Sequence, residues 1–452
     1  MPLGPREYET IRLRNSLLIG LGIRESLSFW TGHPFDFEIW VRLGYYVSKG
    51  FDPYRTTGPI ASLSIPGTGL LPSIGYPPLW AFMQAVVYDF YSALGIDSRF
   101  LYYFLIKQET VIGDVAVAYL IFLLVKRWAS VSDAQRACAF WMFCPFTIII
   151  SSVWGMFDQL VLVFVLFALL SLNHSSRSSL SEGVGILLKG IPIIFLPALA
   201  WGQHSRVKRV GYVLLALGLA AVAALVPYLV YSDWKISALL ATGTDVVNKV
   251  SNSMNYWVIP YVLSANSLLP AGAAAALSAA GYVWVGAILL AYAFCFWGVK
   301  PKDITDRYLI PVLSFATLVF FLTRGSINEQ YATYFIAFGL LERYSLGHLR
   351  SRLFNGVWVS ALGFLLVNNA YMTRFFSPLS IDFTHLNDML VSGFLGDIRY
   401  GLLISLGLSF TAFCAFYLKS LFSELRTIKA QGFPVFGESR GVKELTESHR
   451  DC

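Results

Sequence analysis

Long apolar runs follow one another along most of the chain, and short clusters of Lys and Arg separate them. A run of about 20 apolar residues is long enough to cross the hydrocarbon layer of a bilayer as a helix. Of the 452 residues, 56% are hydrophobic and only 13% are charged, whereas soluble domains carry about 25% charged residues. The mean hydropathy of +0.60 agrees with this contrast. The sequence therefore predicts an all-α polytopic membrane protein.

We predict about ten transmembrane helices and two further apolar segments that do not cross the bilayer. The segment 183–201 is interrupted by Lys189, Pro192 and Pro197, so we expect a re-entrant hairpin whose irregular backbone is buried in protein. The segment 78–95 is expected to lie along the outer face as an interfacial helix. The predicted spans are 14–31, 104–126, 136–152, 158–173, 209–231, 274–298, 306–323, 328–343, 353–373 and 400–421.

The basic clusters set the orientation, because cytoplasmic loops of membrane proteins carry an excess of Lys and Arg. Along this path the clusters fall on one side, which predicts cytoplasmic N- and C-termini. We expect a single transmembrane domain at 1–430, with a large first outer loop at 32–100 and a flexible cytoplasmic tail at 431–452. The plasma membrane or the endoplasmic reticulum is the expected location. The net charge of +7 is attributed to these anchors, which excludes nucleic acid as a partner.

The first outer loop carries two carboxylates at the start of a predicted amphipathic helix, Asp36–Lys49. Such a helix could lie on the membrane surface. Asp36 could act as a general base, because a sugar hydroxyl needs to lose its proton as it attacks. Alternatively, Asp36 only caps the helix. Glu38 could assist Asp36, or it could pair with Arg42 four residues later.

Aromatic residues stand beside prolines later in the same loop, in Asp52-Pro-Tyr54 and Tyr76-Pro-Pro. Tyr54 and Tyr76 suit stacking against a sugar or an acyl chain, and they suit ordinary loop packing equally well.

Two further candidates are Trp154 and Asp158, in a short outer turn between spans. A buried Asp at a membrane boundary is costly unless it has a partner, which makes Asp158 a site candidate. The alternative is that Asp158 caps the following helix. Lys189 lies between apolar residues of the hairpin, where a cation needs an anion or an aqueous cavity.

The late outer turn holds Arg324 and the polar run Asn328-Glu329-Gln330. Arg324 could hold a phosphate through paired hydrogen bonds. Arg324 and Lys189 could instead extend to the headgroups. Lys107, Glu109 and Asp114 lie inside the second span, where we expect an internal charge pair that locks packing. The five Cys residues lack metal-ligand spacing and are expected to be small buried hydrophobes.

These elements, in this order, resemble the GT-C superfamily of membrane glycosyltransferases. Phe35-Asp36-Phe37-Glu38 and Tyr76-Pro77-Pro78-Leu79 are similar to motifs of the dolichol-phosphate-glucose glucosyltransferases, as is Lys189 with its following prolines. Trp154-Gly-Met-Phe-Asp158, Asp114 and the Gly50 to Tyr54 turn resemble the prokaryotic polyprenyl-phosphate-mannose mannosyltransferases. The stretch Ser326 to Tyr331 is similar to the catalytic subunit of the first GPI mannosyltransferase.

The resemblance implies a GT-C-like fold, with Asp36 as catalytic base and 78–95 within the outer loop. The His-containing stretch that precedes the late outer turn in the glucosyltransferases is absent, and Arg324 and Asn328–Gln330 stand there. That departure favours mannose. The Trp-Trp-Asp pattern of oligosaccharyltransferases is also missing, which argues against transfer of a whole glycan to protein.

The expected function is inverting transfer of one sugar, from a polyprenyl (dolichyl) phosphate carrier to a lipid-linked or other glycan acceptor on the extracytoplasmic face. No cofactor is required, because the leaving phosphate is a stable anion; Asp36 and Glu38 could nevertheless hold a divalent metal. Membrane lipids are expected partners, and a small accessory subunit is allowed for. The alternative is a transporter or flippase of lipid-linked saccharides, which predicts charged residues at mid-depth in several helices.

Overall fold

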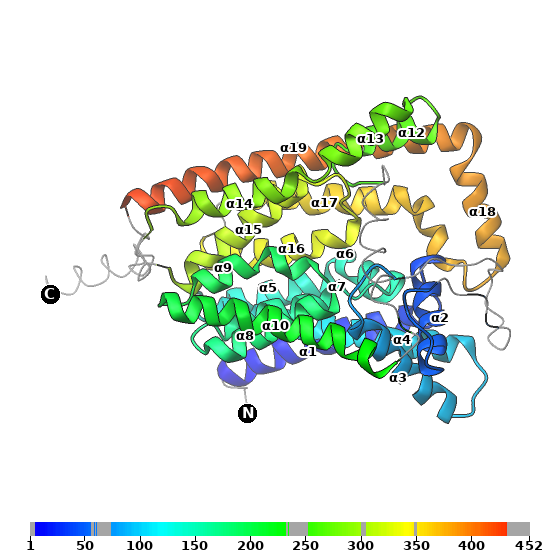
Figure 1. The fold of residues 1–452 in the computed structure, drawn as a ribbon, viewed down its shortest axis with the longest axis horizontal. Coiled ribbons are helices and arrows are strands. Elements are labelled where there is room, and N and C mark those ends of the chain that lie inside the picture. The colour runs from blue at the N-terminus through cyan, green and yellow to red at the C-terminus, as the bar shows by residue number, and fades with distance from the viewer. Residues whose placement is uncertain are drawn as a thin grey trace, which may run out of the picture.

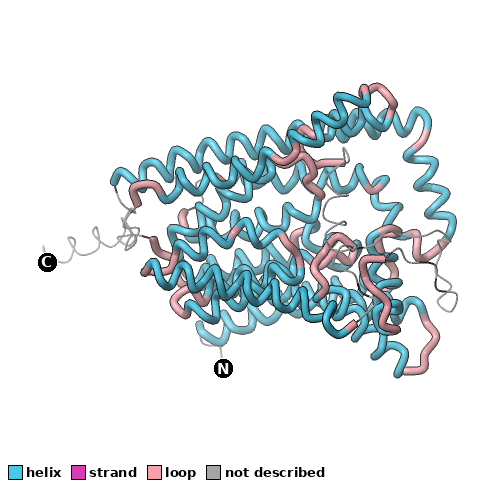
Figure 2. Tube along the Cα trace, in the orientation of Figure 1, coloured by secondary structure: helices cyan, strands magenta, loops and turns pink. Residues whose placement is uncertain are grey.

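The computed structural model describes residues 5–55, 58, 60, 74–231, 234, 252–299, 304–347 and 350–431. Every regular element within these residues is a helix (Figure 2), so the all-α fold class is confirmed. The predicted tail at 431–452 lies outside the described residues from position 432 onward, as do parts of the loops at 56–73 and 232–251.

The chain forms a long bundle whose helices run side by side (Figure 1). In chain order the helices are α1 (Pro5–Ser28), α2 (Asp36–Ser48), α3 (Leu79–Ala93), α4 (Arg99–Lys126), α5 (Val131–Phe143), α6 (Pro145–Ile148), the π-helix η2 (Ile149–Trp154), α7 (Asp158–Leu170), α8 (Ser175–Leu188), η3 (Ile191–Ile194), α9 (Leu196–Trp201), α10 (Arg206–Val230), α12 (Val258–Ala265), α13 (Ala271–Ala280), α14 (Val283–Phe296), α15 (Asp306–Thr323), η5 (Glu329–Tyr331), α16 (Ala332–Ser345), α17 (Ser351–Asn368), η6 (Ala370–Phe376), α18 (Ile381–Val391) and α19 (Gly393–Gln431).

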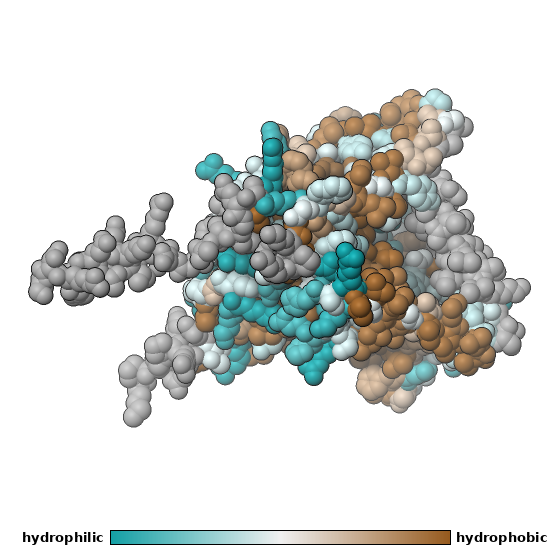
Figure 3. Space-filling model, turned by 60° about the vertical axis from the view of Figure 1, so that its left-hand side comes forward, coloured by the Kyte–Doolittle hydropathy of each residue, from teal (hydrophilic) through white to brown (hydrophobic). Residues whose placement is uncertain are grey.

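One end of the bundle, here the basic end, gathers the predicted cytoplasmic turns. Arg127, after α4, bonds Leu170 O at 2.6 Å and pairs with Asp306 at 3.3 Å. These contacts join the end of α4, the end of α7 and the start of α15. Figure 3 shows hydrophilic side chains over this part of the surface and apolar side chains beside it. Exposed basic residues here include Lys126, Arg127, Arg136, Arg206 and Lys208.

The opposite end, here the loop end, carries α2, α3 and α18 (Figure 1). Trp154 and Asp36 meet there at 3.1 Å, and Asn368 reaches Glu329 at 2.6 Å. The start of α1 and the end of α19 both lie toward the basic end, at opposite edges of the bundle (Figure 1). The turns that the charge pattern assigns to opposite sides of the membrane therefore lie at opposite ends of the bundle.

Four helices in the described residues are long and apolar enough to cross a membrane, or up to six if two bent pairs are each one span. The ten predicted spans are therefore not all confirmed. Helices are present at the other predicted spans, but α7 and α14 end after 13 and 14 residues, about 20 Å of helix. The bends are 48° before Pro145 and 64° before Ala370.

The stretch from Ser175 to Gln203, which contains the predicted hairpin 183–201, leaves the basic end and returns to it. Helix α8 begins at Ser175 and runs back along α7, so that Lys189 reaches Asp158 at the loop end of α7. The chain then returns through η3 and α9, and Gln203 bonds Leu172 O at 3.3 Å. The predicted turn is therefore present, but position 183 lies within α8 and not at the basic end.

The first outer loop differs from the prediction in one respect. A helix is present at the predicted place, as α2, but both of its faces are covered. Trp40 and Arg42, which the sequence assigns to opposite faces, are each at most 2% exposed. Because α2 packs against α3 and α4 at the loop end and most of its residues are buried, it does not offer a free surface to a membrane.

The long helix α19 runs the whole length of the bundle (Figure 1) and packs against α15 and α17. It has 39 residues. At the basic end its Glu424 pairs with Arg350, which also binds Glu342 of α16. At the loop end Arg399 bonds backbone carbonyls at the end of α17.

Candidate functional site

A cavity of about 320 Å³ opens at the loop end, where segments far apart in the sequence converge. Its walls come from the turn before α2, the end of η2, the turn before α12, η5, the bend between α17 and η6, and the start of α19. The lining residues are His33, Phe35, Asp36, Tyr76, Trp154, Asn252, Tyr261, Asn328, Glu329, Gln330, Asn368, Asn369, Arg374 and Arg399.

Asp36 enters this cavity because a tight turn fixes the start of α2. The ring Nδ1 of His33 accepts the backbone N–H groups of Phe35 and Asp36, at 3.3 and 3.1 Å. His33 therefore supplies the side-chain contacts that cap α2. Asp36 is the first residue of the helix, so its carboxylate still lies where it favours the helix dipole.

Trp154 approaches Asp36 from a different part of the chain. It is the last residue of the π-helix η2, an element often found at functional sites. Its indole N–H donates to Asp36 Oδ2 at 3.1 Å, and its ring stacks on His33 with centroids 4.9 Å apart. The following residue, Gly155, has φ +85°, which an L side chain adopts only with strain.

The charge state of Asp36 reflects opposing influences. Burial raises the pKa of Asp36, while the Trp154 hydrogen bond and the charges of Arg374 and Lys189 lower it. The side chain is 25% accessible, and it faces the cavity that it lines. Burial and the nearby Arg374 lower the pKa of His33 well below its ordinary value. Neutral His33 keeps Nδ1 available as an acceptor.

Two arginines face the same cavity from the late part of the chain. Arg374 lies in η6 and Arg399 lies near the start of α19. Neither forms an ion pair with a carboxylate of the described residues; Arg399 donates instead to Val367 O and Asn368 O, at 3.1 and 2.8 Å. Cations without a carboxylate partner are available to an anionic ligand.

The backbone that presents Arg374 is unusual. Ala370, Tyr371 and Met372 have φ of 47°, 55° and 77°, three successive left-handed residues without a glycine. Such conformations cost free energy and cluster at functional sites. Here they turn the chain sharply after α17 and bring η6 beside the cavity.

Carboxamides line much of the remaining wall, and they form a connected chain. Asn252 donates to Asn368 Oδ1 at 2.6 Å, and Asn368 donates to Glu329 Oε1 at 2.6 Å. The side-chain oxygens of Asn252 and Gln330 are buried and bond no described residue. Carboxamides beside aromatic rings suit a ligand rich in hydroxyl groups.

Lys189 and Asp158 lie next to this cavity without lining it. Lys189 Nζ contacts both carboxylate oxygens of Asp158, at 2.9 and 2.8 Å. The ammonium also lies 5.0 Å from the Tyr76 ring centroid. The N-cap position of α7 is Phe157, and Asp158 is the first residue of the helix, so Asp158 is not the N-cap. Because the pair is buried and mutually neutralising, Lys189 is not a free phosphate ligand.

Three other candidates lie outside the cavity lining. Glu38 pairs with Arg42, as one of the two sequence-based alternatives expected. Tyr54 donates its hydroxyl to Tyr76 O at 2.9 Å and so supports the wall from behind. Arg324 lies over the rings of Phe320 and Tyr331, at 5.0 and 5.5 Å from their centroids.

The structure thus brings together six of the sequence candidates: Asp36, Tyr76, Trp154, Asn328, Glu329 and Gln330. Sequence reasoning missed His33, Asn368, Arg374 and Arg399. The arginines carried a signal, since they are isolated basic residues at the edges of outer loops, where few are expected. His33 carried none, because its role depends on the fold of the turn.

No group of three or more His, Cys, Asp or Glu side chains is arranged to hold a metal ion among the residues that the structure describes. The four described cysteines, Cys138, Cys144, Cys295 and Cys414, are buried and unpaired as disulfides, and Cys452 lies outside the described part of the chain.

Comparison with known proteins returned no matching family model and no similar curated protein.

Proposed function

We propose that the protein is an inverting glycosyltransferase that moves one sugar, with mannose as the favoured candidate, from a polyprenyl phosphate carrier to a glycan acceptor on the extracytoplasmic face. The observation that carries the proposal is the cavity itself, in which Asp36 faces Arg374 and Arg399. The reaction needs a base that removes a proton and cations that balance the released phosphate, and one small cavity holds a carboxylate and two arginines.

The reaction is a single displacement at the anomeric carbon. The acceptor oxygen forms a bond to that carbon while the bond from the carbon to the carrier phosphate breaks. Asp36 takes the acceptor proton, and the leaving phosphate keeps the electron pair. Asp36 suits the role because burial raises its pKa, which makes its carboxylate a stronger base than an ordinary Asp.

The arginines suit the change in charge at the leaving group. A phosphodiester carries one negative charge, and the released monoester approaches two, since its second pKa is about 6. Arg374 and Arg399 lie on separate elements and lack carboxylate partners in the described residues. Fixed cations aimed at developing charge lower a barrier more than cations already neutralised.

The carboxamides and aromatic rings supply sugar contacts. The carboxamides of Asn252 and Gln330 line the cavity, and carboxamide groups bond sugar hydroxyls. Trp154 and Tyr76 line the same cavity, and pyranose rings pack their C–H faces on aromatic rings. These groups share the cavity with Asp36.

The test is transfer by the purified full-length protein, incubated with labelled polyprenyl-phosphate-mannose or polyprenyl-phosphate-glucose and a lipid extract as acceptor. We expect product from the mannose donor, and a loss of about 10²- to 10⁴-fold in rate for Asp36→Asn. Asp89→Asn is the matched control, because Asp89 is an exposed Asp of α3 and should leave the rate unchanged. Full activity of Asp36→Asn would remove Asp36 as the base.

One observation favours the alternative of a transporter or flippase. Glu182 of α8 is fully buried, and both of its carboxylate oxygens lack a partner among the described residues. Ionisable groups in this setting often mark ion or proton pathways. Movement of a fluorescent lipid-linked sugar across proteoliposomes, without any transfer product, would favour this alternative.

A further inference from the structure

A lysine of α4 is buried beneath the site without a carboxylate to balance it. Lys107 is 0% exposed. Its ammonium donates to Thr31 O, to Thr31 Oγ1 at 3.1 Å and to Ser152 O at 2.9 Å. It also lies 5.0 Å from the ring centroid of Phe37. No ion pair joins it to any acidic side chain in the described ranges.

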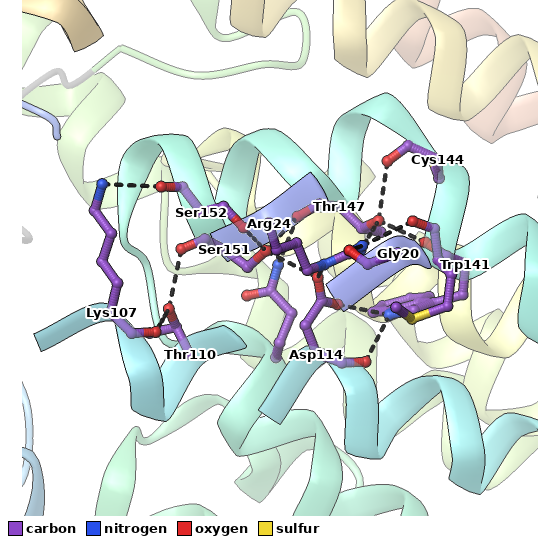
Figure 4. A network of polar contacts seen from close by, with 12 residues as sticks. Gly20, Arg24, Lys107, Thr110, Asp114, Trp141, Cys144, Thr147, Ser151 and Ser152 are labelled. Carbon is purple, nitrogen blue, oxygen red and sulfur yellow. Dashed lines mark hydrogen bonds and ion pairs between the residues drawn. The ribbon is translucent and has the colours of Figure 1, made fainter. Parts of the chain in front are cut away.

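The acidic residue two turns further along α4 is not available to Lys107. Asp114 pairs with Arg24 of α1 and accepts hydrogen bonds from Trp141 at 2.6 Å and from Ser151 at 2.8 Å. Figure 4 shows this network to one side and Lys107 reaching Ser152 on the other. An internal charge pair is therefore present, but it joins Asp114 to Arg24 of α1 and not to Lys107. Lys107 has carbonyl and hydroxyl partners instead.

The partners of Lys107 lie just beyond α1 and in the last turn of the π-helix η2. Helix α1 ends at Ser28, and the Thr31 hydroxyl bonds Leu27 O at 2.8 Å. Ser152 is two residues before the end of η2 at Trp154. Carbonyl groups at helix carboxyl ends carry partial negative charge, which stabilises a nearby cation. The Ser152 carbonyl is such a group, and the carbonyl and hydroxyl of Thr31 supply two further hydrogen bonds.

The two chain segments that Lys107 contacts continue directly into the cavity lining. From Thr31 the chain passes through His33 to Asp36, and from Ser152 it passes to Trp154. His33 N bonds Trp154 O at 3.3 Å, and Trp154 Nε1 bonds Asp36 Oδ2 at 3.1 Å. Lys107 therefore joins the two segments a few residues before Asp36 and Trp154, the side chains that meet in the cavity.

We infer that Lys107 is a positioning residue, which clamps the end of α1 to the end of η2 and thereby sets the contact between Asp36 and Trp154. Its catalytic consequence rests on the proposed function, whereas the clamp itself does not. Loss of the clamp separates Trp154 from Asp36, which removes an interaction that lowers the pKa of Asp36.

The test compares four variants of the full-length protein. Lys107→Met keeps the length of the side chain but removes its positive charge and its N–H donors. Lys107→Arg keeps the positive charge and N–H donors. Lys126→Met is the matched control, because Lys126 is an exposed lysine of the same helix. Thr31→Val removes the hydroxyl that bonds both Lys107 and Ser152 O and keeps the two carbonyl contacts of Lys107. It weakens the clamp in a protein that keeps Lys107, and it decides the question if Lys107→Met does not fold.

Hydrogen exchange of peptides covering 30–37 and 152–157 is the first measurement. We expect Lys107→Met to speed exchange about 10- to 100-fold in both segments, as loss of a buried hydrogen-bonding group implies. Thr31→Val should give a smaller change in the same segments. Lys107→Arg should restore most of the protection, and Lys126→Met should match the wild type.

The pH profile of transfer is the second measurement, and its acid limb should move to higher pH in Lys107→Met. A purely structural loss would lower the yield of folded protein without moving that limb. Unchanged exchange in both segments would overturn the clamp, whatever the activity. If the wild type shows no transfer, the proposed function fails, and the exchange measurement still decides the role of Lys107.

Discussion

Asp36 illustrates how one side chain can be placed by partners that the local sequence does not reveal. His33 caps α2 in its place, and Trp154 donates to its carboxylate. The outer-loop pattern was sufficient to select Asp36 as a candidate. It could not supply Arg374 or Arg399, because their proximity to Asp36 depends on the packing of α17 and α19 against the first half of the chain.

At the residue scale we expect Arg374→Gln to weaken donor use. Loss of a charge-assisted hydrogen bond to phosphate costs about 1.5–3 kcal/mol, which corresponds to a fall of about 10- to 150-fold in kcat/KM for the donor. The measurement is initial rate against donor concentration. Arg352→Gln, at an exposed arginine of the basic end, should have no effect; an equal loss there would show a general effect on the protein.

A second prediction at this scale concerns pH. The base must be unprotonated, so kcat/KM should fall as pH drops through the pKa of Asp36. Because burial raises that pKa, the acid limb should lie above the ordinary value of about 3.9 for Asp. Trp154→Phe removes a hydrogen bond that lowers this pKa, so it should move the limb further upward. A limb that stays in place in Trp154→Phe would contradict the assignment.

At the scale of single elements, the site depends on breaks in helices. Apolar runs predicted helices over 136–152 and 353–373, and helices are present there. The π-helix at the end of the first run and the left-handed turn at Ala370–Met372 were not predictable from hydropathy, because apolar periodicity does not register a change of backbone pattern. Both breaks present lining residues, Trp154 and Arg374, to the cavity.

Gly155→Ala tests one of these breaks. Gly155 has φ +85°, and a Cβ there would lie 2.7 Å from Phe37 Cδ2, next to Asp36. The left-handed conformation alone costs about 1–2 kcal/mol for a residue other than glycine. We expect a lower Tm in detergent and a marked loss of transfer.

The matched control for this change is Gly190→Ala. Gly190 has φ −63° and open space around its Cβ position. Alanine should therefore be tolerated there, and a similar loss in both variants would show that the effect does not come from the strained turn.

For the whole molecule, the distribution of Lys and Arg predicted which turns lie together, and Arg127 does link the turns after α4 and α7. The number of spans was harder to predict, since several helices are shorter than the apolar runs that contain them. Helix α16 shows a further reason, because almost every residue is buried in protein, so its apolar composition does not require contact with lipid.

Cysteine labelling tests the two ends. The described native cysteines are buried, so a Cys452→Ser background should react little with an impermeant maleimide. We expect Lys126→Cys to react only from the cytoplasmic side of sealed vesicles, and Asp97→Cys, at an exposed residue before α4, only from the other side. Labelling of both from the same side would contradict the orientation.

The length of α19 links events at the two faces of the protein. At 1.5 Å per residue, its 39 residues measure about 58 Å, and the helix carries a cavity guanidinium near one tip and an anchored carboxylate, Glu424, near the other. A helix resists compression along its axis, so a displacement of one end along that axis is transmitted to the other end. A lipid or protein that displaces the far tip by an ångström would shift Arg399 by a comparable amount against Asp36.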